Sequence, residues 1–184
     1  VIYDMFDRKK HVVKTEQRRY SKYYVAVDYG TQNPTAFGLW GLSRGVWYKV
    51  KEYHHEGRKG KQRTDSEYSE DMKEFVGDLE VSVIVDPSAA SFIAQLKKDG
   101  FHVRKANNDV VDGIRNVATA LNDNKIKYND CCKETFREFS SYIWDEKAAD
   151  RGEDKPVQKN DHHMDSDRYF VNTVVMKKSG LSFS

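Results

Sequence analysis

Three aspartates far apart in the chain stand where a fold can present carboxylates to one cleft. Asp28 ends the apolar run YYVAVD, and Asp86 ends a second apolar run, VSVIVD, just before Pro87. Asp165 lies in a helical pattern, DHHMDSDRYFVNTVV, that carries His162 three residues earlier. Carboxylates that share a site repel one another and raise one another's pKa. A site built from several of them therefore predicts bound cations, and the pattern is typical of a divalent-metal nuclease.

Each of these residues also has a simpler interpretation. A single aspartate at a strand end is typical of a turn or a helix cap, and His162 beside His163 is consistent with a cap or a surface pair. The joint pattern of two strand ends followed by a helical His and Asp pair favours a site. Carboxylate ligands suit Mg²⁺ or Mn²⁺, and an imidazole favours Mn²⁺ of the two. Two such ions ~3.5 to 4 Å apart support in-line phosphoryl displacement.

The elements that must position these residues belong to an α/β fold. Three successive strand candidates are joined by short links, which predict an antiparallel meander. A strand, a helix and a second strand follow, with the spacing of a parallel βαβ crossover. Because open α/β sheets place their sites at the carboxyl ends of strands, Asp28 and Asp86 are expected to face each other across one edge. The predicted strands are 23–28, 35–42, 46–54, 81–86 and 101–106, and the segment 125–130 is predicted to be a short strand or hairpin.

Helices are predicted from apolar stripes, with Ser66 and Ser88 as N-caps of the first two and Gly100 ending the second. The segment 145–160 is expected to be an exposed loop or hairpin. In residues 1–22 the apolar side chains recur with neither helical nor strand spacing, so this segment is predicted to be a linker from an upstream domain. Residues 23–184 are predicted to form one domain. The predicted helices are 66–79, 88–99, 109–122, 131–144 and 161–177.

Composition bounds the class of protein but does not decide its function. The 184 residues carry 31 basic and 29 acidic side chains, a net charge of only +2, so nucleic-acid binding has to come from local clusters. No stretch approaches the ~20 apolar residues that a membrane span needs. Cys131 and Cys132 are adjacent, a spacing that is unfavourable for a disulfide bond between them. They are therefore predicted to be reduced intracellular thiols. The start at Val1 suggests a piece excised from a longer protein.

Two further patterns have open interpretations. The glycine-bearing loop with Arg58, Lys59, Lys61 and Arg63 could contact DNA phosphates, or it could be a solvated surface loop. The run His54, His55, Glu56 resembles a metal-binding sequence, but alternation of side chains along a strand argues against ligation by both histidines.

The segments VAVDYGTQNPTAFGLWG, SVIVDPSAASF and NDHHMDSDRY resemble the nuclease domain of tailed-phage terminase large subunits, of the type found in siphophages of Bacillus. The resemblance covers residues 23–175. It implies an RNase H-like fold, with a mixed central sheet of five strands in the order 3-2-1-4-5 flanked by helices. Two residues depart from the family pattern: Asp167 stands where a small or apolar residue is usual, and His163 doubles the histidine.

The resemblance also implies function. Asp28, Asp86 and Asp165 would be the metal-binding carboxylates and His162 a supporting ligand, while Arg168 and Tyr169 would brace the helix. The activity would be metal-dependent endonuclease cleavage of concatemeric viral double-stranded DNA, with two Mn²⁺ or Mg²⁺ ions. The implied partners are an upstream ATPase domain of the same polypeptide, the small terminase subunit and the portal protein, in the host cytoplasm.

No ATPase activity is expected in this chain, because GRKGKQ lacks the P-loop spacing and its Ser or Thr. Two alternatives stay open: another RNase H-like nuclease, such as a Holliday-junction resolvase, and a non-catalytic domain that clamps DNA or docks in the motor.

Overall fold

The computed structural model describes residues 1–57 and 63–177, and its centre is one mixed sheet of seven strands. The strand order is β1-β7-β4-β3-β2-β5-β6. Strands β2, β3 and β4 pair antiparallel, and the remaining pairs are parallel. The strands are β1 (Val12–Val13), β2 (Lys22–Asp28), β3 (Thr35–Ser43), β4 (Val46–His55), β5 (Ser82–Val85), β6 (His102–Lys105) and β7 (Ile126–Asn129).

The predicted meander and crossover are both confirmed. The meander is β2-β3-β4, and β5 and β6 are parallel strands joined by a helix. These five strands lie in the order 3-2-1-4-5 that the resemblance implies, and β7 and β1 extend the sheet beyond β4. Residues Val27 and Val85 are partners in the parallel pair of β2 and β5, so the residue after each lies at the same edge of the sheet.

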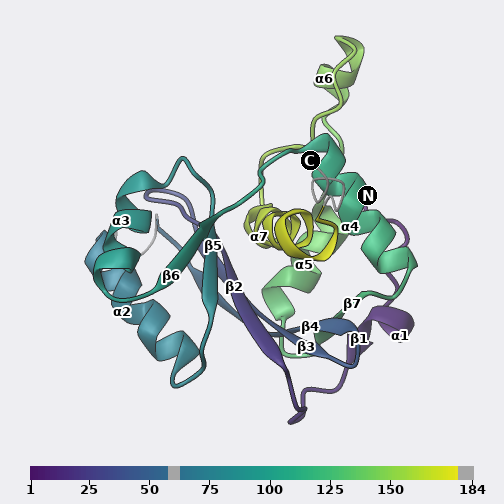
Figure 1. The fold of residues 1–184 in the computed structure, drawn as a ribbon. Helices are drawn as coiled ribbons and strands as arrows, with labels where there is room; N and C mark the ends of the chain where they lie inside the picture. Colours follow the sequence, from purple (N-terminus) through teal and green to yellow (C-terminus); the bar gives the residue numbers. More distant parts are fainter. Residues whose placement is uncertain (58–62, 178–184) are drawn as a thin grey trace, which may run out of the picture.

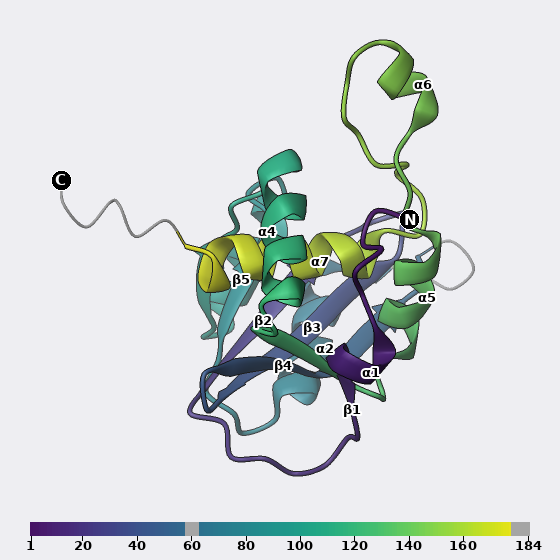
Figure 2. The same cartoon turned by 90° about the vertical axis from the view of Figure 1, so that its right-hand side faces the viewer.

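Helices cover both faces of this sheet (Figures 1 and 2). Those on one face are α2 (Asp65–Val76) and α3 (Ala90–Lys98), and those on the other are α4 (Val111–Asn122), α5 (Lys133–Ser141) and α7 (His162–Phe170), which continues into a π-helical turn, Val171–Val175. Successive side chains of β2 point to opposite faces of the sheet, so this strand contributes to the cores on both faces. Val25 and Val27 pack with α2 and α3, while Tyr24 and Ala26 pack with the helices of the opposite face.

The helix starts differ from the predictions. Thr64, not Ser66, is the N-cap of α2, and its hydroxyl accepts from the Glu67 amide while the Glu67 carboxylate accepts from the Thr64 amide. This reciprocal capping box satisfies two amides that lack helical partners. The N-cap of α3 is Ala89 rather than Ser88, and no side chain caps it.

The segment predicted as a loop or hairpin projects away from the body of the molecule and contains a short helix, α6 (Glu146–Asp150) (Figure 1). An isolated antiparallel bridge between Trp144 and Pro156 closes its base. Within the described ranges, no helix has the length and apolar character needed to cross a bilayer.

The N-terminal residues pack onto the domain. Tyr3 is buried between the rings of Phe139 and Tyr142, and the helix α1 (Arg8–His11) leads into β1, which pairs with β7. The assignment of residues 1–22 as a lead-in from an upstream domain stays a prediction.

A buried ion pair joins the last helix to the sheet. The Nζ atom of Lys49 on β4 lies 2.7 Å from Oδ1 of Asp167 on α7, and both side chains are almost inaccessible to solvent. Lys49 also donates to the Thr135 hydroxyl, and the Tyr128 hydroxyl donates to Asp167. Burial opposes the charged lysine, but the Asp167 carboxylate holds the pKa of Lys49 above its ordinary value.

Gly38 on β3 makes room for this pair. A Cβ atom at Gly38 would lie 2.7 Å from Cε of Lys49, too close for any real contact. The unusual aspartate of the helix motif, Asp167, is therefore a buried anchor rather than a group of the cleft.

Replacing Lys49 by methionine should lower the free energy of unfolding by about 3 to 5 kcal/mol, because Asp167 is left buried without its counter-charge. Urea denaturation measures the change. Lys97→Met, at an exposed position near the end of α3, is the matched control and should change stability by less than about 0.5 kcal/mol. A Lys49→Met protein as stable as the wild type would contradict the anchoring role.

Candidate metal centre

Two of the predicted aspartates lie side by side at the carboxyl ends of neighbouring strands. Asp28 is the last residue of β2, and Asp86 directly follows β5, one residue beyond the paired Val27 and Val85. Asp86 accepts hydrogen bonds from the Ser88 amide and the Asn108 side chain. These hydrogen bonds orient the Asp86 carboxylate at the carboxyl end of β5.

Helix α7 brings three more side chains to the same edge. Nδ1 of His162 lies 3.0 Å from Oδ2 of Asp28 and 3.9 Å from Oδ1 of Asp161, the residue before the helix. Asp165 lies one turn further along α7, on the face that His162 shares. Four aspartates and one histidine therefore meet at one end of the sheet.

Burial and neighbouring charges both raise the pKa values of the cleft carboxylates. Burial raises the pKa of Asp165 to about 8, and the charges of Asp28 and Asp161 add to the increase. Burial also raises the pKa of Asp28, with Asp86 contributing in the same direction and His162 opposing it. The site therefore disfavours full ionisation in the absence of cations.

His162 supplies positive charge next to Asp28. Burial alone would lower its pKa, but the hydrogen bond to Asp28 and the charges of Asp28 and Asp161 raise the pKa to about 9. In the metal-free protein the imidazole is thus a cation at neutral pH, and it neutralises part of the carboxylate charge.

Arg168 and Tyr169 contact the carboxylates directly as well as bracing the helix. Arg168 donates to Asp165 and to the backbone carbonyls of Asn108 and Asp109. Gly113 on α4 allows this path, because a Cβ atom there would lie 2.6 Å from Cγ of Arg168.

The Tyr169 hydroxyl donates to Oδ2 of Asp86 at 3.1 Å. Burial raises the pKa of Tyr169, and the charges of Asp28, Asp165 and Asp86 raise it further. The phenol is therefore a hydrogen-bond donor that lies within the field of all three predicted aspartates.

A solvent-open cavity of about 690 Å³ gives access to the cleft. Asp28, Asp161, His162 and Asp165 line it together with residues from the β2–β3 link and the segment before α7. Its oxygen-rich donor set, with carboxylates that resist ionisation together, fits hard divalent cations such as Mg²⁺ or Mn²⁺.

The two histidines of the motif point in different directions. His162 faces Asp28, whereas His163 is fully buried and faces His54 of β4. The geometry therefore places His162, not His163, at the aspartate cleft.

The predicted DNA-contacting loop lies mostly outside the described residues, which do not include Arg58, Lys59 and Lys61. Arg63 is described, and its guanidinium is paired with the Asp71 carboxylate of α2. Its role in DNA binding stays a prediction.

Sequence reasoning missed Asp161 and understated Tyr169. Asp161 precedes α7, where an aspartate is typical of a helix cap, yet no capping hydrogen bond from its side chain is present. The sequence feature that could have identified Asp161 is its position directly before His162 and His163.

Comparison with solved structures confirms the resemblance to phage large terminases. The chain is 68% identical to the large terminase of a thermophilic bacteriophage, solved in complex with ADP, with a TM-score of 0.94. That match covers 96% of this chain and 45% of the phage terminase, so this chain spans just under half the length of that relative.

More distant structures share the fold. The P22 large terminase nuclease domain has a TM-score of 0.74 at 18% identity, covering 92% of this chain and 89% of that one. The large terminase nuclease of the thermophilic phage G20c with bound magnesium has a TM-score of 0.66 at 14% identity, covering 91% and 94%. These likenesses confirm the predicted RNase H-like fold. No protein-family model and no curated protein matches the chain.

In the metal-free protein, Asp165 should make thermal stability fall as pH rises. Its pKa is 3.8 in a free chain and about 8 in the fold, so its stabilising contribution is complete below pH ~4 and is lost as pH rises through 8. Asp165→Asn keeps the shape but cannot ionise. In EDTA, its melting temperature should decline less between pH 5 and 8 than that of the wild type. Parallel curves for the two proteins would show that the fold does not raise the pKa of Asp165.

Proposed function

We propose that this chain is the nuclease part of a phage large terminase, and that it hydrolyses phosphodiester bonds of double-stranded DNA with divalent metal ions. Asp28, Asp86, Asp161 and Asp165 meet at one end of the sheet, beside an open cavity that all of them but Asp86 line, and this arrangement carries the proposal. The 68% identity to the large terminase of the thermophilic phage supports the family context.

In this proposal Asp28, Asp86 and Asp165 hold two Mg²⁺ or Mn²⁺ ions, and His162 supports Asp28. Bound ions of this kind activate a water and stabilise the leaving oxygen in phosphoryl displacement. Two ions ~3.5 to 4 Å apart are the arrangement through which carboxylate sites catalyse this displacement.

The surrounding residues prepare the cleft for an anionic substrate. Arg168 holds Asp165 and offsets its charge, and Tyr169 directs one oxygen of Asp86. His162 orients Asp28 and shares with Arg168 the neutralisation of carboxylate charge that bound cations would otherwise supply.

The substrate and partners follow from the family. We infer that the DNA is concatemeric viral DNA in the infected bacterial cell, delivered by an ATPase domain of the same polypeptide acting with the small terminase subunit and the portal protein. This chain would not hydrolyse ATP, since its P-loop lookalike at 57–62 lacks the required spacing.

Supercoiled plasmid incubated with the protein should be nicked and linearised with Mn²⁺ or Mg²⁺ and left intact with EDTA. The conversion is followed on agarose gels. Intact plasmid at millimolar Mn²⁺ would contradict the nuclease assignment, and preferential cutting of four-way junctions over duplex would favour a resolvase instead.

Asp28→Asn or Asp165→Asn should abolish cleavage while circular dichroism shows a retained fold, because each removes a ligand from an open cleft. Asp123→Asn, at an exposed position after α4, is the matched control and should cut normally. His162→Ala should be milder, with a loss of about 10- to 100-fold, as for a residue that orients a ligand. Wild-type cleavage by either aspartate variant would refute the assignment.

A further inference from the structure

We propose that His54, His163 and Glu138 form a binding site for a nitrogen-preferring divalent ion of the zinc class, with ligands distinct from those of the aspartate cleft. The proposal does not rest on the cleavage function. In the described residues, these three side chains form the one group of three potential metal-binding residues whose ligand atoms all lie within 4.8 Å of one another.

Two imidazole nitrogens already face each other at this place. Nδ1 of His54 on β4 lies 3.0 Å from Nε2 of His163 on α7, across 109 residues of sequence. One ring can donate a proton to the other, or both lone pairs can bind one cation. Two nitrogen ligands on a tetrahedral zinc, each about 2.0 to 2.1 Å from the metal, are separated by only slightly more than this distance.

Glu138 supplies the third donor from a third element, α5. Its Oε1 atom accepts the backbone amides of His163 and Met164 at 2.7 and 3.0 Å. These bonds orient the buried carboxylate beside the two rings. Two imidazoles and one carboxylate are a donor set that zinc uses with a fourth position open to water.

The outer nitrogens of both rings have carboxylates next to them. Nε2 of His54 lies 3.0 Å from Oε1 of Glu56, and Nδ1 of His163 lies 4.0 Å from Oε1 of Glu52. Among the described residues, Nδ1 of His163 is buried and has no hydrogen-bond partner. Metal-binding histidines commonly direct the second ring nitrogen to a carboxylate, which fixes the tautomer and strengthens the ligand.

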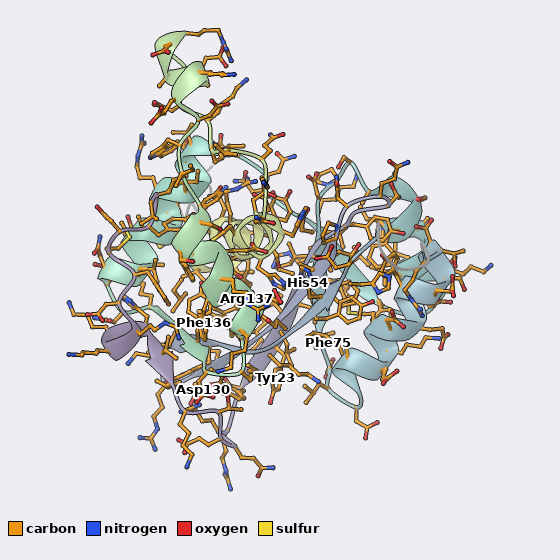
Figure 3. All side chains as sticks on the ribbon, turned by 180° about the vertical axis from the view of Figure 1, so that it is seen from behind. Tyr23, His54, Phe75, Asp130, Phe136 and Arg137 are labelled. Atoms are coloured by element: carbon orange, nitrogen blue, oxygen red, sulfur yellow. The ribbon has the colours of Figure 1, made fainter. Side chains whose placement is uncertain are left out.

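An ion can reach the site from solvent. A cavity of about 220 Å³ is lined by His54, Glu56 and Glu138, and by Arg137 of α5. Figure 3 shows His54 near the middle of the molecule with Arg137 beside it in projection. The partly exposed His54 and the Glu138 carboxylate would meet the ion first, with the buried His163 behind them.

The local charge favours a cation. Glu52 and Glu56 lie next to the two rings, while the nearby Lys49 is paired with Asp167. A bound ion would connect β4, α5 and the first turn of α7. Because His163 directly precedes the turn that carries Asp165, this ion would hold the helix start in the position that the aspartate cleft needs.

The test uses the full chain with Asp28→Asn and Asp165→Asn, which weakens the aspartate cleft as a competing site. Zn²⁺ is titrated by calorimetry, and Co²⁺ by its visible absorption, whose intensity reports tetrahedral nitrogen and oxygen coordination. One equivalent should bind, and excess Mg²⁺ should not displace it.

Adding His54→Ala to this background should weaken Zn²⁺ binding by at least about tenfold, because a direct ligand should matter no less than an outer-shell partner. Glu138→Gln, which keeps an oxygen acceptor for the α7 amides, should also weaken it. His55→Ala is the matched control from the opposite face of β4 and should leave the affinity unchanged. Absence of Zn²⁺ binding in the background protein, or equal affinity with and without His54, would overturn the proposal and leave an ordinary histidine–histidine hydrogen bond.

Discussion

The ion pair between Lys49 and Asp167 is the contact on which the arrangement of the cleft depends. Asp165 and Asp167 are two residues apart, so their side chains leave α7 about 200° from one another. One therefore faces the cleft while the other enters the core, where Lys49 of the central sheet holds it at 2.7 Å. A buried carboxylate without a partner is costly. This requirement fixes the rotation of the helix and, through it, the direction of His162 and Asp165.

A cleft positioned in this way concentrates negative charge that the protein only partly offsets. His162 and Arg168 are the cationic groups that contact Asp28 and Asp165, and Tyr169 contributes a neutral donor to Asp86. The pKa of Asp165 is nevertheless raised to about 8, largely by burial and by its acidic neighbours. This accumulation of buried, mutually repelling carboxylates is the physical reason why the site favours divalent ions. In the proposed function, bound ions would also reduce the repulsion of DNA phosphates.

Local rules predicted much of this architecture from the sequence. Apolar runs that end in aspartate located Asp28 and Asp86 at strand ends, and helical spacing placed His162 beside Asp165. The short links predicted the meander, whose strand bounds agree with the structure within one residue.

The features that sequence reasoning missed depend on long-range contacts or on local competition. Lys49 lies on a strand with charged neighbours and resembles a solvent-facing residue, and its partner is 118 residues away. His54 and His163 are likewise 109 residues apart in the sequence, so local patterns could not predict their contact. Thr64 replaced Ser66 as a cap because Glu67 completes its capping box. Asp161 resembled a cap and proved to be part of the cleft wall.

Crystals soaked in Mn²⁺ and measured for anomalous scattering provide the most direct test of the central claim. The account predicts two anomalous peaks ~3.5 to 4 Å apart among the carboxylates of Asp28, Asp86 and Asp165, with Asp28 turned from His162 toward the ions. A cleft without an anomalous peak at millimolar Mn²⁺, with the Asp28–His162 contact unchanged, would contradict it.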